Sequence, residues 1–275
     1  MMKRSVGFFG VSAALLVLAT LAQPAEARGV SHGSSGTGPR GHSYSRDGNV
    51  QGGGGSWSRE SETTGPNGKS FSTTATGSCG DGSCSAQSTT TGPNGNSWTK
   101  NKSLEATGTG GFTYDATTIG PNGKTVTTGE TVQATGNGGW TVDKSVTGPN
   151  GQTATVTGTG QCAAGAGCGQ SLTGAGPNGK TWSKTTSTQA TGDNGLTHNS
   201  TTTYPNGLSK TTATTVQATG NGGWTTQSTT TGPLGGVWTT TGSGQVTPGS
   251  GVSGQSVTTA PSGAQVTRNV WVTAE

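Results

Sequence analysis

Four cysteines are the residues best placed to do chemistry in this chain, and their spacing predicts disulfide bonds. Cys79 stands close to Cys84 in the sequence, and Cys162 stands close to Cys168. An even number of cysteines in an exported chain favours disulfides, and a metal site would need more ligands than these positions supply. We expect one disulfide within each of two hairpins, each stabilising the fold by about 2 kcal/mol because it closes a short loop.

Histidines and carboxylates are too scattered to form a catalytic group. His32 and His42 lie in a glycine-rich segment, whereas His198 lies in a predicted strand, and no nucleophile, base and acid can be aligned from them. The glycine-rich nonapeptide that binds calcium in β-helix repeats is absent from the sequence. We therefore predict a chain that is not an enzyme, with no catalytic residue, metal or cofactor.

Large aromatic residues recur at two regular positions of a repeat and suggest either a binding surface or a core. Such a column could stack against the sugar rings of a polysaccharide, or it could cover the thin apolar core of a sheet. The residues concerned are Trp57, Trp98, Phe112, Trp140, Trp182, Trp224 and Trp238.

The repeat that positions these residues is marked by the turn sequence Gly-Pro-Asn-Gly, first complete at 65–68. Its proline returns every 28 residues from Pro93 to Pro261, after two steps of 27 from Pro39. Proline presets the first central turn position and glycine takes a left-handed one, which is typical of a β-hairpin connection. A period this constant predicts a repeat architecture rather than disorder.

Between the turns, the residues alternate as in half-buried β-strands. In 124–134, Val126 and Val132 share one face, while Thr125 and Thr131 share the other. A second glycine-rich turn, such as 135–139, follows, so each repeat reads strand, turn, strand, turn. The two cysteine positions hold a small and a large residue in neighbouring repeats, which places them opposite each other across this second turn.

The predicted fold is all-β: an antiparallel β-hairpin meander with a 28-residue period, curled or superhelical because wide open sheets curl. A β-solenoid with one repeat per coil is the alternative. A transmembrane barrel is a third arrangement, disfavoured because the loops lack its alternation of long and short and because lysines fall on the apolar face. These lysines are Lys100, Lys102, Lys144 and Lys210.

Three segments are expected along the chain. Residues 1–27 resemble a secretory signal peptide, with Lys3 and Arg4 before an apolar run and Ala25-Glu26-Ala27 at the cleavage site. Residues 28–60 form a glycine-rich lead-in with a degraded first repeat, and residues 61–275 form the β-hairpin repeat domain. The protein is thus expected to be secreted, in the extracellular space, at the cell surface or in the periplasm, with no transmembrane helix after cleavage.

Composition limits the remaining classes of function. The chain has 53 glycines, 25% hydrophobic and 9% charged residues, which excludes a large globular core. Its formal net charge of +4 is too small to imply a nucleic-acid partner.

Two resemblances follow from these motifs. Thr113-Tyr114-Asp115 with Pro121-Asn122-Gly123-Lys124 is similar to one unit of the tyrosine–aspartate (Rhs/YD-type) repeats of bacterial surface and toxin-shell proteins. That resemblance implies antiparallel hairpins in a spiralling sheet. Residues 60–275 also resemble secreted bacterial proteins built from Thr-Gly-Pro-Asn-Gly repeats, which implies export but no established activity.

Three functions fit these features. The first is a secreted, non-enzymatic structural or adhesive protein of the cell surface or extracellular matrix, whose edge strands could pair with further copies. The second is a module that binds polysaccharide of the envelope or matrix through the aromatic columns. The third is an ice-binding protein, suggested by threonine rows such as Thr153, Thr155 and Thr157.

Overall fold

The structure is a computed structural model and describes residues 28–37, 43–192, 194–248 and 251–274. The predicted signal peptide, 1–27, lies outside these ranges. Within them, no helix is long and apolar enough to span a membrane.

The described residues form eighteen β-strands that follow one another in the sequence. Residues 28–60, expected as a lead-in, contain the first two strands and the start of the third. The strands are β1 (Arg28–Thr37), β2 (Ser43–Gly53), β3 (Ser56–Thr64), β4 (Ser70–Gly80), β5 (Ser83–Thr91), β6 (Ser97–Thr107), β7 (Gly111–Ile119), β8 (Thr125–Gly136), β9 (Gly139–Thr147), β10 (Thr153–Ala163), β11 (Gly167–Ala175), β12 (Thr181–Thr191), β13 (Gly195–Thr203), β14 (Ser209–Gly220), β15 (Gly223–Thr231), β16 (Val237–Thr247), β17 (Gly251–Thr259) and β18 (Gln265–Ala274).

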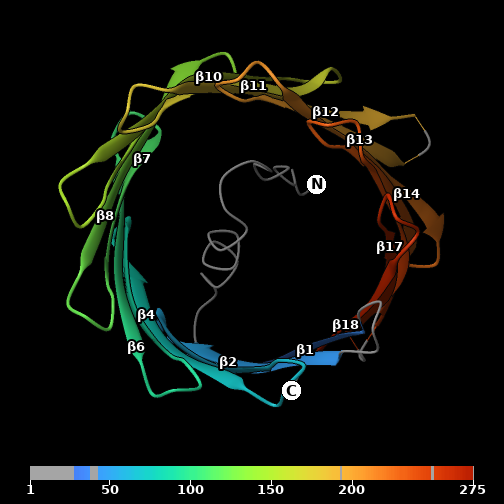
Figure 1. The fold of residues 1–275 in the computed structure, drawn as a ribbon, viewed down its shortest axis with the longest axis horizontal. Coiled ribbons are helices and arrows are strands. Elements are labelled where there is room, and N and C mark those ends of the chain that lie inside the picture. Colours follow the sequence, from blue (N-terminus) through green and yellow to red (C-terminus); the bar gives the residue numbers. More distant parts are fainter. Residues whose placement is uncertain (1–27, 38–42, 193, 249–250, 275) are drawn as a thin grey trace.

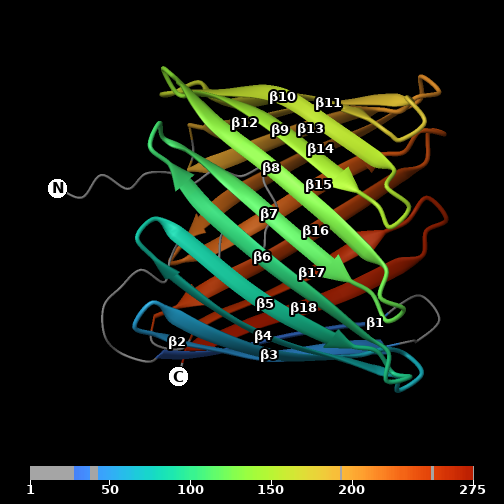
Figure 2. The ribbon, with the colours of Figure 1, turned by 90° about the vertical axis from the view of Figure 1, so that its left-hand side faces the viewer.

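These strands form one closed antiparallel barrel. Each strand pairs with its neighbours in the sequence, and β1 also pairs with β18, from Val30 opposite Ala274 to Thr37 opposite Thr267. Figure 1 shows the resulting ring, and Figure 2 shows the strands inclined across its wall. The prediction of an open meander, and its solenoid alternative, are wrong. The twist that was expected to curl the sheet brings its two edges together, where their free backbone groups pair.

The Gly-Pro-Asn-Gly turns and the second, glycine-rich turns lie at opposite ends of the barrel, because successive strands are antiparallel. We call the end with the Gly-Pro-Asn-Gly turns the proline rim and the other end the glycine rim. At the proline rim, the amide of Gly68 donates to the carbonyl of Gly65 at 3.0 Å, and Gly68 has a φ of 69°. At the glycine rim, Asn137 and Gly138 have φ values of 49° and 74°. Such left-handed backbone explains the glycine and asparagine at these positions.

The alternation along each strand separates an inner from an outer wall. In β10, every second residue is less exposed than its neighbours, with Ala154 and Val156 on one side and Thr153 and Thr155 on the other. Side chains converge on the concave side of a curved sheet and diverge on its convex side, so the less exposed set is the inner one. The most buried apolar residues, Ala116, Val132, Trp140 and Val142, belong to this set.

Four inner-wall tryptophans lie over a glycine of the neighbouring strand. A Cβ atom added at Gly160 would meet the ring of Trp140, and one at Gly244 would meet the ring of Trp224. Trp57 covers Gly77 and Trp182 covers Gly174 in the same way. The glycines therefore leave room for rings that lie flat on the wall, a pairing that protects exposed backbone in sheets.

This packing predicts that Gly160→Ala destabilises the barrel by about 1–3 kcal/mol, because the new methyl group must displace the ring of Trp140. The matched control is Gly169→Ala on the outer wall, where the nearest atom is the carbonyl oxygen of Thr186 at 3.8 Å. Urea unfolding followed by tryptophan fluorescence should show a loss in the first variant only. Equal stability of the two variants would contradict the packing.

Candidate functional site: a basic inner wall

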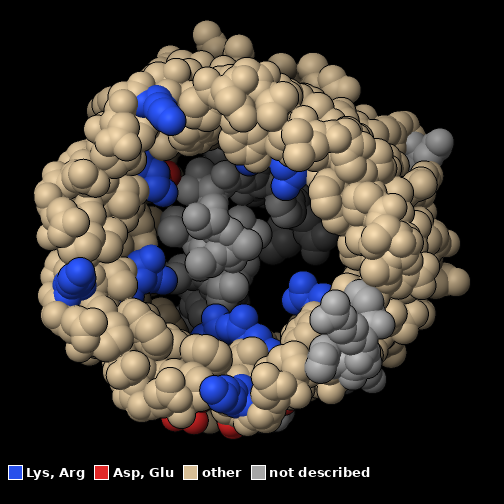
Figure 3. Space-filling model, in the orientation of Figure 1, with Lys and Arg blue, Asp and Glu red and all other residues tan. Residues whose placement is uncertain are grey.

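Basic side chains gather on the inner wall of the barrel, where Figure 3 shows lysine and arginine around the hollowed centre. Cross-strand register connects them: Lys210 faces Thr202, for example, and Thr202 faces Lys184. Among the described strand residues of this wall, the one carboxylate is Glu130. The basic residues of the inner wall are Arg46, Arg59, Lys100, Lys102, Lys144, Lys184, Lys210 and Arg268.

The same alternation that places the tryptophans inside places these charges inside. Trp98, Lys100 and Lys102 are spaced by two residues in β6, as are Trp57 and Arg59 in β3. The argument against a barrel, that lysines fall on the apolar face, is therefore wrong. It assumed that the apolar face of a barrel points outward, whereas here this face lines the interior.

The outer wall carries the opposite charge. Asp115 lies beside Gly129 on this wall, and Asp47 in β2 is directly opposite Glu62 in β3. The carboxylates of the outer wall are Asp47, Glu60, Glu62, Glu105, Asp115 and Asp143. Lys69, Lys124 and Lys180 lie in turns of the proline rim. A net charge of +4 in the whole sequence thus conceals a basic interior and an acidic exterior.

Glu130 is neutralised by a direct neighbour. The Nζ atom of Lys144 donates to its Oε2 atom at 3.0 Å, and the two residues face each other in β8 and β9. The side chain of Glu130 is only 6% exposed, against 31% for Lys144. The pair leaves the remaining basic residues of the inner wall without a carboxylate on that wall, within the described strands.

Arg59 has a specific set of contacts. Its Nη2 atom donates to Nε2 of His32 at 3.3 Å. Its Nε atom is buried and has no hydrogen-bond partner, and the same holds for Nε1 of Trp57, two residues earlier on the same wall. Buried donors without acceptors are uncommon, since each costs about 1–3 kcal/mol.

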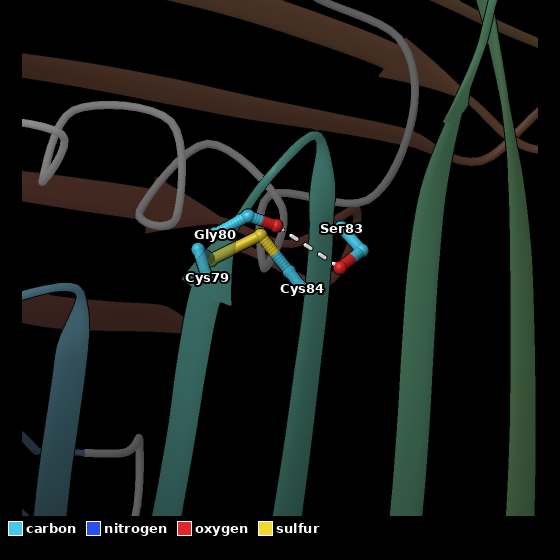
Figure 4. The surroundings of a disulfide bond; sticks show 4 residues. All are labelled: Cys79, Gly80, Ser83 and Cys84. Carbon is cyan, nitrogen blue, oxygen red and sulfur yellow. Dashed lines mark hydrogen bonds between the residues drawn. A yellow bond between two sulfur atoms is a disulfide. The ribbon is translucent and has the colours of Figure 1, made fainter.

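The four cysteines form two disulfides at the glycine rim. Cys79 is bonded to Cys84 and Cys162 to Cys168, each directly opposite its partner across a hairpin turn. In Figure 4 the first bond lies beside the turn, where the hydroxyl of Ser83 also donates to the carbonyl of Gly80 at 3.0 Å. The bonds hold the ends of hairpins, and the basic residues lie nearer the middle of the wall.

The aromatic residues singled out from the sequence all lie on the inner wall, divided between the two rims. Trp98, Trp182 and Trp238 are next to the proline rim, and the other four are next to the glycine rim. They lie against the wall, as the glycine contacts show, and form no open stacking face on the exterior.

The described histidines have ordinary hydrogen-bond partners. The Nδ1 atom of His198 shares a hydrogen bond with the hydroxyl of Thr188 at 2.8 Å. No group of three or more His, Cys, Asp or Glu residues that could hold a metal ion occurs in the part of the chain that the structure describes.

Comparison with known proteins finds matches in structure but none in sequence. No protein-family model and no curated protein matches the sequence. A mutant of the Rhodobacter blastica porin superposes with a TM-score of 0.54 at 11% identity, covering 91% of this chain and 99% of that chain. A structure reported as "Asymmetric conductivity of engineered proteins" superposes with a TM-score of 0.55, with the same identity and coverage. The fold is porin-like.

This result corrects the resemblance and the functions expected from the sequence. The likeness to spiralling hairpin repeats is wrong, because the strands of this porin-like barrel close into a ring. Edge-to-edge assembly of a structural or adhesive protein loses its basis, because β1 and β18 pair with each other. The polysaccharide and ice-binding alternatives also lose theirs, since the aromatic residues lie inside and the threonine rows lie on a convex wall.

One property distinguishes this barrel from transmembrane barrels, whose apolar residues point outward into lipid. The outer wall here consists mainly of Thr, Ser, Gln and Asn with the carboxylates named above. Its side chains bond to one another, as in Gln87 to Asn101 and Gln255 to Asn269, both at 2.9 Å.

Proposed function

We propose that the chain forms a pore of the cell envelope, with a lumen that passes small solutes and prefers anions. The observation that carries the proposal is the closed 18-stranded barrel with a basic inner wall. Barrels of 16–18 strands are wide enough to enclose an aqueous channel. Rings of basic side chains attract anions and repel cations in pores. Export through the predicted signal peptide supports a location in the envelope.

Planar-bilayer recording of the purified, folded chain tests this proposal. We expect discrete conductance steps and, in a potassium chloride gradient, a reversal potential of the sign given by chloride permeation. Neutralising Lys184 and Lys210 to Gln should move that potential towards zero, whereas Lys124→Gln with Lys180→Gln at the proline rim should change it less. Folded protein that inserts but conducts no ions would contradict a pore.

The outer wall favours a second candidate function: a water-soluble exported barrel that holds anionic solutes in its interior. Threonine, serine and carboxylates prefer water to hydrocarbon, and a charged side chain on a lipid-facing wall costs several kcal/mol at the bilayer midplane. Glu60, Glu62 and Asp143 are on this wall, each exposed. A wall of this kind is stable in water without detergent.

Flotation with lipid vesicles separates the two functions. A pore that inserts in lipid moves to the top of a density gradient with the vesicles and resists extraction by alkaline carbonate. A soluble barrel stays in the aqueous fraction, and remains folded and dispersed without detergent.

A further inference from the structure

The inner wall between β3 and β6 has a floor of small residues flanked by basic ones. Cross-strand register places Arg59 opposite Ala75, Ala75 opposite Ser88 and Ser88 opposite Lys100. In the parallel row, Trp57, Gly77, Ala86 and Lys102 follow one another in the same way. We call this region the basic trough; its members are Trp57, Arg59, Ala75, Gly77, Ala86, Ser88, Lys100 and Lys102.

The two sides of the basic trough are close enough to act on one ligand. They are three strand spacings apart, about 14 Å between backbones. Arginine and lysine side chains each extend several ångströms from the backbone, over a floor with little side-chain bulk. Arg46, on the neighbouring strand β2, adds further positive charge to the same wall. No carboxylate stands in either of the two rows.

Positive charge without a carboxylate points to the kind of ligand. Nε of Arg59 and Nε1 of Trp57 are buried, so a ligand in the lumen meets the outer guanidinium nitrogens of Arg59 and the amines of Lys100 and Lys102. His32 accepts from Nη2 of Arg59 and so holds one end of the guanidinium in place. An oxyanion supplies acceptor oxygens and negative charge together, which is what these groups lack.

We propose that the basic trough binds a polyvalent oxyanion of the oligophosphate class. A chain of linked phosphates presents oxygens to Arg59 on one side and to Lys100 and Lys102 on the other, whereas a small monovalent anion reaches only one side. This site names a class of solute for the proposed lumen. It rests on the proposed function in one respect: the interior of the barrel must be open to solutes.

The test is calorimetric titration of the folded chain with inorganic tripolyphosphate at physiological ionic strength. We expect saturable binding that weakens at least about tenfold in the double variant Arg59→Gln with Lys102→Gln, because two charge-assisted contacts are lost. Lys124→Gln with Lys180→Gln removes the same charge from the proline rim and should change the affinity less than about twofold. Circular dichroism checks that both variants keep the barrel.

The outcomes separate this site from the pore. Equal weakening in both double variants, or no saturable binding by folded protein, would overturn the basic trough even if the chain conducts ions. Tight binding lost only in the trough variant supports the site even if the chain forms no conducting pore.

Discussion

A disulfide forms across the barrel seam when Ser35→Cys is combined with Asn269→Cys. The two positions face each other on the outer wall in β1 and β18. Directly opposed residues of antiparallel strands have Cα atoms about 4.5–5.5 Å apart, which is within disulfide reach. We expect mild oxidation to crosslink most molecules, and peptide mapping of the monomer to identify the 35–269 bond beside the two native disulfides.

The control for the seam is Ser35→Cys with Gln255→Cys. Gln255 faces Asn269 from the next strand, β17, so it is about 9–10 Å from Ser35 and beyond disulfide reach. An open sheet would hold β1 and β18 far apart at opposite edges and would crosslink only between molecules. A crosslinked dimer in place of a crosslinked monomer would therefore refute closure.

Removing Lys144 should destabilise the barrel more than removing any other lysine of the inner wall. Lys144→Met leaves the carboxylate of Glu130 buried without its cation, and breaking such a pair from one side typically costs about 3–5 kcal/mol. Partial exposure of Lys144 places the expected loss near the lower end, about 3 kcal/mol. Urea unfolding at neutral pH measures it.

Two further variants distinguish this effect from loss of any inner-wall lysine. Adding Glu130→Met to Lys144→Met should restore most of the stability, because no charge then remains buried. Lys184→Met should have little effect, since its cross-strand partners are Leu172 and Thr202 rather than a carboxylate. A similar loss in Lys144→Met and Lys184→Met would show that the ion pair has no special role.

The different charges of the two walls bear on whether the barrel lies in a membrane or in water. The inner wall is basic, whereas the outer wall is acidic and rich in threonine. A bilayer would require an apolar band where Glu60, Thr74 and Thr155 now stand. Bilayer recording and vesicle flotation therefore decide the surroundings of the barrel, and binding of tripolyphosphate decides the chemistry of its interior.

The sequence by itself determined the local structure of this protein. Proline, asparagine and glycine placed the turns, and the alternation of Thr125, Val126 and Thr127 marked strands with two different faces. Such features depend on residues near one another in the chain. The opposition of Cys79 to Cys84 also followed from their equivalent positions on either side of one turn.

Only the tertiary structure decided closure and the direction of each face. Closure depends on pairing between β1 and β18, whose residues are at opposite ends of the chain. A period of two shows that a strand has two faces, but not which one becomes concave, because that depends on the sign of the sheet's curvature. Curvature turned Lys100, Lys102 and the aromatic columns inward and rows such as Thr153, Thr155 and Thr157 outward. It thereby made a basic lumen from residues scattered along the sequence.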